Sequence, residues 1–177
     1  MTDAEFRAAL VGQLAGLRRY AVGLTGNAAL ADDLVQDSIE RALRQSAQLR
    51  DLKHLPGWLR RILHNLYIDE IRRGRGRGQQ QDIMDFADHL ELSAPAAEGG
   101  AARDFLRAMN ALSVEHREIL LLVGLEDLGY REIASELDIP IGTVMSRLAR
   151  ARERLRSLMQ DGGGSDVTPF PRAKGKP

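Results

Sequence analysis

The sequence predicts an all-α protein of two small helical domains joined by a flexible linker. Apolar residues recur at helical spacing along nearly all of the 177 residues, and no sustained apolar/polar alternation suggests a strand. Glycine and proline gather in a few places, where they mark breaks between helices. Hydrophobic residues make up 44% of the chain and aromatic residues 5%, so packed cores must consist mainly of Leu, Ile, Val and Ala.

Three helical patterns form the predicted first domain, residues 1–73. They cover residues 5–24, 28–47 and 57–73. The first two are separated by a break at Thr25, Gly26 and Asn27, and a loop at about residues 48–56 precedes the third.

The composition then changes, which predicts a flexible linker at residues 74–101. The linker begins as GRGRG and QQQ, continues through an acidic segment with room for a short helix near residues 83–90, and ends as SAPAAEGG. At roughly 3.3 Å per residue it reaches about 90 Å when fully extended, so the two domains could hold distant sites on one target.

Four further helical patterns form the predicted second domain, residues 102–160. They cover residues 102–111, 113–125, 130–137 and 141–159. Ser113 is suited to cap the second of these helices, and Glu115 lies in its first turn, where the helix dipole favours a negative charge. The tail, residues 161–177, is predicted to be disordered.

Composition excludes several classes of function. The chain has no cysteine, which rules out disulfides and thiolate metal sites, and no apolar run of about 18 residues or basic leader. We therefore expect a cytoplasmic protein without membrane insertion. Catalytic motifs are absent and the four histidines are scattered, so we expect neither an enzyme nor a cofactor or metal site. Equal numbers of acidic and basic residues argue against a generic polyanion binder, although an average can hide local patches.

One such patch lies on the last predicted helix. Its buried stripe would be Val144, Leu148, Ala151, Leu155 and Leu158. The opposite direction holds only small residues, Gly142, Ser146 and Ala149. One flank carries Thr143, Arg147, Arg150 and Arg154, and the other carries Met145, Arg152 and Arg156. Small residues between cationic edges suit the DNA major groove, because the helix can enter deeply while arginines reach the phosphates.

The short helix YREIASEL precedes this one and directs Ile133, Ala134 and Leu137 inward. The turn DIP follows, so the two helices predict a helix-turn-helix in which the second helix reads base edges. Asp138 stands where Gly is common, and it should adopt a left-handed backbone at some cost. Alone, the arginine face could equally be a solvated surface, but the helix-turn-helix context favours DNA binding.

Together these residues resemble a known family. ALSVEHREILLLVGLEDLGYREIASELDIPIGTVMSRLARARERLR is similar to region 4 of extracytoplasmic-function (ECF) sigma factors, the small alternative initiation factors of bacterial RNA polymerase. ALADDLVQDSIERAL (residues 29–43) resembles region 2.2, and WLRRILHNLYIDEIRRGRGR (residues 58–77) resembles regions 2.3 and 2.4. The resemblance implies polymerase binding with minus-10 recognition and melting for the first domain, and minus-35 recognition for the second.

The helix predicted at residues 28–47 has an apolar side and an acidic side. Ala31, Leu34, Val35, Ile39 and Ala42 centre on the first, and Asp33, Gln36, Asp37 and Glu40 centre on the second. An acidic face suits a cationic protein partner rather than DNA, unless it is simply solvated. The resemblance implies contact with the β′ clamp helices of the polymerase through Asp32, Asp33, Leu34, Val35, Gln36 and Asp37.

The helix predicted at residues 57–73 has a core face of Trp58, Leu59, Ile62, Leu63 and Leu66. Arg61, Asn65 and Arg72 share a neighbouring stripe, with Arg60 and His64 beside it. Arginine pairs with phosphate and an amide can read an unstacked base. The resemblance implies that this surface and the preceding loop open the minus-10 element. The Arg-Gly run that follows could alternatively bind RNA, but it is short.

Thirteen residues are predicted to meet DNA. They are Arg60, Arg61, Asn65, Arg72, Tyr130, Arg131, Thr143, Met145, Ser146, Arg147, Ala149, Arg150 and Arg154. Family members often carry a basic or polar residue at the position of Met145 and a larger one at that of Ala149, so the minus-35 sequence is left open. His64 and Tyr67 leave the minus-10 preference open in the same way.

The resemblance implies an alternative sigma factor that binds core RNA polymerase at the β′ clamp helices and β flap. It would direct initiation at promoter DNA with specific minus-35 and minus-10 elements, and an anti-sigma factor would clamp its two domains. Two alternatives stay open: a sigma-like decoy that sequesters an anti-sigma factor, and a helix-turn-helix repressor, which would normally dimerise.

Overall fold

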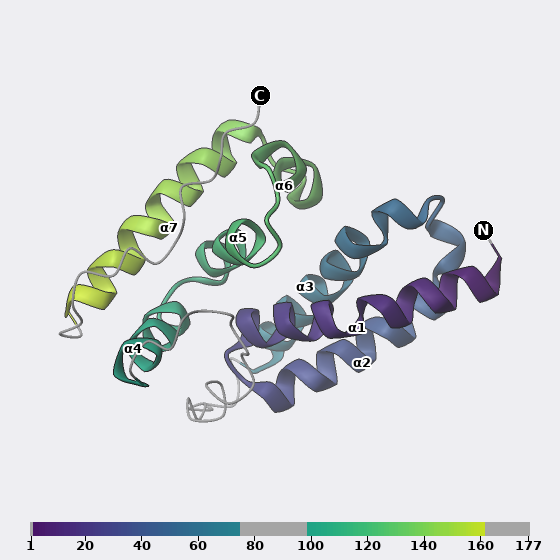
Figure 1. Cartoon of the computed structure of the whole chain (residues 1–177), viewed down its shortest axis with the longest axis horizontal. Coiled ribbons are helices and arrows are strands. Elements are labelled where there is room, and N and C mark those ends of the chain that lie inside the picture. Colours follow the sequence, from purple (N-terminus) through teal and green to yellow (C-terminus); the bar gives the residue numbers. More distant parts are fainter. Residues whose placement is uncertain (1, 75–98, 162–177) are drawn as a thin grey trace. The chain divides into compact units, whose positions relative to one another are not determined.

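The computed structural model describes residues 2–74 and 99–161, which fall into two compact units within Met1–Asp82 and Ile83–Pro177. Every regular element of these two ranges is a helix, and they contain no strand, so the all-α prediction is confirmed (Figure 1). The linker with its possible helix at residues 83–90 lies outside the described residues except at its two ends, and so does the tail beyond Asp161. The predicted domain boundaries therefore stay predictions.

The first unit is a bundle of α1 (Asp3–Thr25), α2 (Ala28–Arg44) and α3 (Leu55–Gly74), in which each helix packs against the other two. Its core is aliphatic with a few aromatic side chains, among them Phe6, Tyr20, Leu24, Leu59 and Leu63. Trp58 is half-buried and meets Phe6 edge to face, with ring centroids 6.5 Å apart. This contact supports the prediction that Trp58 belongs to the packed side of its helix.

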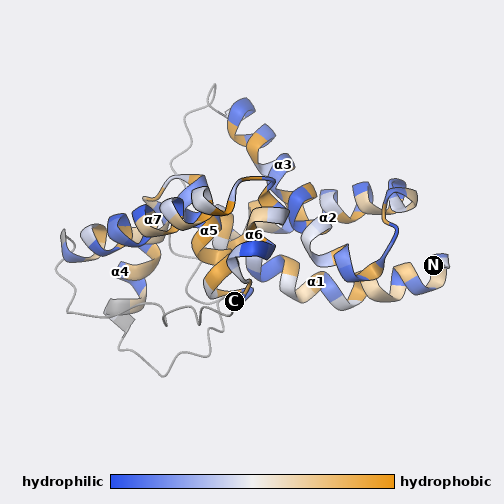
Figure 2. Ribbon diagram, turned by 90° about the horizontal axis from the view of Figure 1, so that it is seen from above, coloured by the Kyte–Doolittle hydropathy of each residue, from blue (hydrophilic) through white to orange (hydrophobic). Residues whose placement is uncertain are grey.

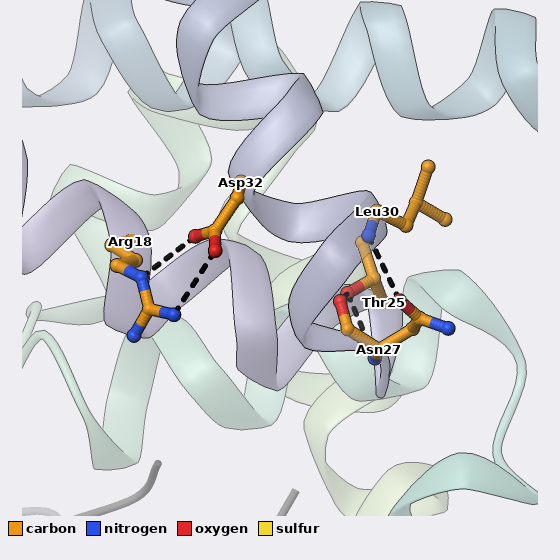
Figure 3. A network of polar contacts seen from close by, with 5 residues as sticks. All are labelled: Arg18, Thr25, Asn27, Leu30 and Asp32. Atoms are coloured by element: carbon orange, nitrogen blue, oxygen red, sulfur yellow. Dashed lines mark hydrogen bonds and ion pairs between the residues drawn. The ribbon is translucent and has the colours of Figure 1, made fainter. Parts of the chain in front are cut away.

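The predicted break between the first two helices is confirmed, and it is held by local hydrogen bonds (Figure 3). Gly26 takes the left-handed backbone, with φ at 68°, and its N–H donates to the Val22 carbonyl. The Asn27 side chain caps α2 by accepting from the Leu30 N–H at 2.8 Å, and the Thr25 hydroxyl donates to the Asn27 carbonyl at 2.9 Å. These hydrogen bonds pair backbone groups at the end of α1 and the start of α2, where the chain turns.

Two boundaries in the first unit differ from the prediction. Helix α2 ends at Arg44, and residues Ser46–Gln48 form a separate 3-10 turn that leads to the buried Leu49. A second 3-10 turn, Leu52–His54, occupies the predicted loop, and α3 begins at Leu55 rather than at residue 57. Pro56 in the first turn of α3 costs no hydrogen bond, because the first N–H groups of a helix have no partner within it.

The second unit contains α4 (Gly99–Asn110), α5 (Val114–Gly124), α6 (Tyr130–Leu137) and α7 (Ile141–Asp161). Helix α4 begins three residues before the predicted start at residue 102. Helix α5 is the central element: its second half is buried, and Figure 2 shows it as a largely hydrophobic ribbon. Helix α7 packs against α4, α5 and α6. The predicted cap of α5 is confirmed, because the Ser113 hydroxyl accepts from the His116 N–H at 3.4 Å.

A buried arginine joins α4 to α5. Arg117 is only 6% exposed, and its guanidinium donates to the carbonyls of Met109 at 2.9 Å, Asn110 at 2.7 Å and Leu112 at 3.0 Å. The carbonyls of Met109 and Asn110 belong to the last turn of α4, which has no intrahelical donors, and that of Leu112 follows in the connection to α5. One side chain in the first turn of α5 therefore supplies donors to the end of α4.

Replacing this side chain should destabilise the second unit alone. We expect Arg117→Met to lower its free energy of unfolding by about 3 kcal/mol, because carbonyls at the end of α4 lose charged donors. The only tryptophan, Trp58, lies in the first unit. Urea titration should therefore show an earlier loss of helical circular dichroism with an unchanged fluorescence midpoint. Arg103→Met, at an exposed position of α4, is the control. An unchanged circular dichroism curve would show that the hydrogen bonds of Arg117 do not stabilise the second unit.

Candidate functional site

The second unit holds a helix-turn-helix made by α6, the turn at Asp138 to Pro140, and α7. Asp138 has φ 54° and ψ 48°, which confirms the predicted left-handed backbone. The N–H groups of Asp138 and Ile139 both donate to the Ala134 carbonyl, and the Pro140 carbonyl accepts from the N–H groups of Thr143 and Val144 in the first turn of α7. Ile133 is fully buried in this corner, so the crossing of the two helices is fixed by packing as well as by the turn.

Helix α7 separates a buried face from an exposed one. Val144, Leu148, Ala151 and Leu155 are buried as predicted, but the stripe continues at Met159, and Leu158 is half-buried. The small residues Gly142, Ser146 and Ala149 are all exposed. A strip of small side chains therefore lies open along the helix, and a Cβ added at Gly142 would meet nothing within 4 Å. The face that was predicted to enter a groove is unobstructed within this unit.

The predicted DNA contacts of the second unit differ in their exposure. Arg150, Arg154 and Arg131 are exposed, as is Met145, whereas Tyr130 and Thr143 are half-buried. The side chain of Arg147 is only 23% exposed, and it lies 3.7 Å from the Glu115 carboxylate at the start of α5. The Ser146 hydroxyl donates to the Thr143 carbonyl at 3.2 Å. Because Arg147 is paired, the first exposed arginine on this flank of α7 is Arg150, one turn later.

The acidic face of α2 is also present on the surface of the first unit. Asp33, Gln36, Asp37 and Glu40 are exposed. Glu40 pairs with Arg44 at 2.9 Å, and the Gln36 amide donates to Glu40 at 3.4 Å. No ion pair engages Asp33 or Asp37 within the described residues. Asp33 and Asp37 thus carry the available negative charge of this surface.

Asp32 forms an ion pair with Arg18 (Figure 3). It accepts two hydrogen bonds from Arg18 of α1, at 2.7 and 3.2 Å. This hydrogen bonding raises the pKa of Arg18 above its usual value. The two-point geometry joins α1 to the start of α2 and pairs the charge of Asp32, whose side chain is 53% exposed, with a guanidinium.

The segment also contains side chains that belong to the core. Leu34 is 4% exposed, and Val35 is half-buried. Ser38, which sequence reasoning did not single out, is fully buried and donates to the Leu34 carbonyl at 2.6 Å. Of the residues predicted to touch polymerase, Leu34 therefore supports the helix from inside, and its assignment as a contact stays an untested prediction.

On α3 the predicted stripe is exposed at Arg61, Asn65 and Arg72, whereas Arg60 is 7% exposed. Tyr67, about two turns further along the same face of α3, is also buried. The spacing of residues 60, 63 and 67 is that of a buried helix face, and it was the sequence signal that could have found Arg60 inside. The aliphatic stem of an arginine can pack in such a place while its guanidinium makes polar contacts.

Nothing in the described ranges points to a different kind of site. In residues 2–74 and 99–161, no group of three or more His, Asp or Glu residues could hold a metal ion. No helix of that same part of the chain is both long and apolar enough to span a membrane.

These two surfaces define a DNA-binding transcription regulator with a helix-turn-helix in one unit and an acidic helix in the other. The comparisons agree with this class. The chain matches the family model "Sigma-70 region 2" over residues 11–77 and "Sigma-70, region 4" over residues 102–155. It is 32% identical to the ECF RNA polymerase sigma factor EcfG of Rhodopseudomonas palustris, over 96% of this chain and 92% of that one. The protein therefore belongs to the ECF sigma factors, and it is an alternative sigma factor that directs transcription.

Further relatives support the assignment. The chain is 36% identical to the ECF sigma factor SigL of Mycobacterium tuberculosis, over 83% of this chain and 84% of that one. The sigma factor RpoE of Bartonella quintana, solved with the anti-sigma factor NepR, matches with a TM-score of 0.70 and 30% identity over 88% of this chain and 97% of that one. The PhyRSL–NepR complex of Sphingomonas sp. Fr1 matches at 0.62 and 20% identity, over 93% of each chain, and shows the fold alone.

The strained turn gives a test of the helix-turn-helix geometry. We expect Asp138→Gly to raise the free energy of unfolding of the second unit by about 0.5–1 kcal/mol, because Gly takes the left-handed backbone without steric cost. Asp138→Val should lower it by at least about 1 kcal/mol, because a β-branched residue fits this conformation poorly. Urea denaturation followed by circular dichroism measures both. Equal stability of the two variants would show that residue 138 is not left-handed in solution.

Proposed function

We propose that the two units divide the work of initiation. Residues 1–73 act as region 2, which docks on core RNA polymerase and opens the minus-10 element, and residues 102–160 act as region 4, which reads the minus-35 element. Residues 74–101 act as the linker. The observation that carries this proposal is the segregation of charge: Asp33 and Asp37 are exposed on α2, while Arg150 and Arg154 are exposed on α7.

The acidic face of α2 suits a cationic helical surface such as the β′ clamp. Asp33 and Asp37 lie one turn apart on the same side of α2, and both are exposed. Complementary charge across an interface steers association and fixes its register. Gln36 lies on this face, Val35 is half-buried on the apolar side of the helix, and Asp32 contributes mainly by holding α1 through Arg18.

The exposed face of α7 suits the major groove. Ser146 and Ala149 allow close approach, and Arg150 and Arg154 reach toward the phosphate walls. Arg131 on α6 has the position from which the first helix of a helix-turn-helix meets the backbone. On α3, Arg61, Asn65 and Arg72 supply two cations and an amide for the opened minus-10 element, with the turn Leu52–His54 before them.

The neutral net charge limits binding to random DNA. Affinity for duplex DNA depends on how many phosphates are neutralised, and the Glu115 carboxylate beside Arg147 reduces that number for the free chain. Promoter specificity is then expressed in the cytoplasm by the polymerase complex, in which the chain supplies recognition and no catalytic chemistry. The flap of the β subunit is the proposed dock of the second unit.

An anti-sigma factor is the proposed regulator. Its support is the 30% identity to a sigma factor that was solved with the anti-sigma factor NepR. Such a partner would hold both units and compete with the polymerase.

Charge reversal on α2 tests the polymerase contact. We expect Asp33→Lys with Asp37→Lys to abolish co-elution with bacterial core RNA polymerase on a sizing column, because two attractive contacts become repulsive. Asp3→Lys with Asp104→Lys makes the same change of net charge elsewhere, at two residues that pair with the nearby Arg7 and Arg107, and it should co-elute normally. Co-elution of both variants would remove the proposed role of α2.

Substitutions around α7 test the minus-35 contact. Arg150→Ala should lower holoenzyme affinity for its promoter and reduce the slope of log affinity against log salt by about 1. Arg147→Ala should have a smaller effect on both, because Glu115 offsets part of the Arg147 charge, and polymerase association should be unchanged in both variants. Glu115→Gln should act in the opposite direction and raise affinity about twofold, because it frees Arg147 and removes one negative charge from its vicinity.

The promoter for this test is one that the wild-type holoenzyme selects from a randomised library, and Arg103→Ala on α4 is the control for loss of an exposed cation. Loss of polymerase association in the Arg147 and Arg150 variants would show that the division of roles is wrong.

A further inference from the structure

The first turns of α7 carry an exposed apolar pair that the proposed function does not explain. Ile141 is 43% exposed and Met145 is 55% exposed, and they are two of only five large hydrophobic side chains with such exposure among the described residues. They are four residues apart on one helix, so their side chains lie on the same face. The part of a recognition helix that contacts base edges is its N-terminal part.

The same turns offer few polar groups for base recognition. Residues 141–146 read IGTVMS and contain no charged side chain. Thr143 is half-buried, and the Ser146 hydroxyl donates to the Thr143 carbonyl at 3.2 Å. Arg147, the first cation, lies beside Glu115 on the other flank. The strongest donors to a guanine edge are therefore missing where base contacts are expected.

The flank that carries the apolar pair changes character along the helix. Met145 is followed on this flank by Arg152 and Arg156, and Arg156 is exposed. A helix that enters the major groove by its first turns places such later residues near the phosphate wall. Gly142, next to Ile141, is exposed, and a Cβ there would meet nothing within 4 Å. Nothing among the described residues of this unit prevents a DNA base from reaching Ile141 and Met145.

We infer that Ile141 and Met145 form an apolar contact for the 5-methyl group of a thymine in the minus-35 element. This inference rests on the proposed role of α7. The thymine methyl is the only apolar group on the major-groove edges of the four bases, so an exposed aliphatic and thioether pair without donors can recognise only that feature. Met145 is the central residue, because its flexible side chain can adapt to the methyl group.

Thymine and uracil differ in this methyl group alone, which provides the test. The wild-type holoenzyme first selects promoter fragments from a library randomised across the minus-35 element. The selected duplex is then prepared with thymine or with deoxyuridine at each thymine of that element in turn. We expect one position at which deoxyuridine weakens binding about three- to fivefold, which corresponds to the burial of one methyl group.

Variants assign the effect to the side chain. Met145→Gln should bring the thymine-to-deoxyuridine ratio at that position close to 1, whereas Met145→Leu should retain it. Val11→Gln, at an exposed apolar residue of α1, should leave the ratio unchanged. Because each ratio compares two DNAs with one protein, partial misfolding of a variant lowers both affinities and cancels.

The outcomes separate the inference from the proposed function. A wild-type ratio near 1 at every thymine, or a ratio that survives Met145→Gln, overturns the methyl contact. If selection and its loss on Arg150→Ala are nevertheless seen, α7 still reads the minus-35 element, and the apolar pair serves a protein contact instead. If the holoenzyme selects no sequence in the randomised segment, the proposed role of α7 fails, and the inference fails with it.

Discussion

The structure of each unit depends on one constraint: without a sheet, every helix must bury an apolar stripe against other helices. On α7 this stripe is Val144, Leu148, Ala151 and Leu155, all nearly inaccessible to solvent. Its burial against three neighbouring helices fixes the rotation of α7 about its own axis. The small residues and arginines then point outward because the opposite side is already occupied. The same constraint on α2 buries Ala31, Leu34 and Ala42 and leaves the carboxylates of Asp33 and Asp37 outside.

Side chains that bond to the backbone complete this arrangement at the points where apolar packing cannot. The end of α4 needs donors, and Arg117 provides them from α5. The turn before α7 needs a left-handed residue, and Asp138 accepts that conformation while its N–H closes the end of α6. Each device satisfies buried or strained backbone groups at a junction between helices. They determine how α4 meets α5 and how α6 meets α7, and so which way the recognition helix faces within its unit.

Two ion pairs then adjust the charge that the surfaces offer. Arg18 holds Asp32 by two hydrogen bonds, and Glu115 lies beside Arg147. In both cases a residue of the expected binding surface is paired with a residue from another helix of the same unit. Partly exposed pairs of this kind contribute little to stability. Their larger effect is on function, because they leave Asp33 and Asp37 on α2, and Arg150 and Arg154 on α7, as the charges available to partners.

The sequence by itself determined the helices, the break at Gly26, the cap at Ser113 and the left-handed Asp138. It also determined the acidic face of α2 and the arginine-rich face of α7. All of these follow from local periodicity and backbone preference, which act over a few residues. The helical spacing also contained the buried position of Leu34 and, unread, that of Arg60. Only the tertiary structure decided that Asp32 is paired with Arg18 and Arg147 with Glu115. These outcomes depend on which side chain of a distant helix comes within a few ångströms, and a helical wheel contains no information about that.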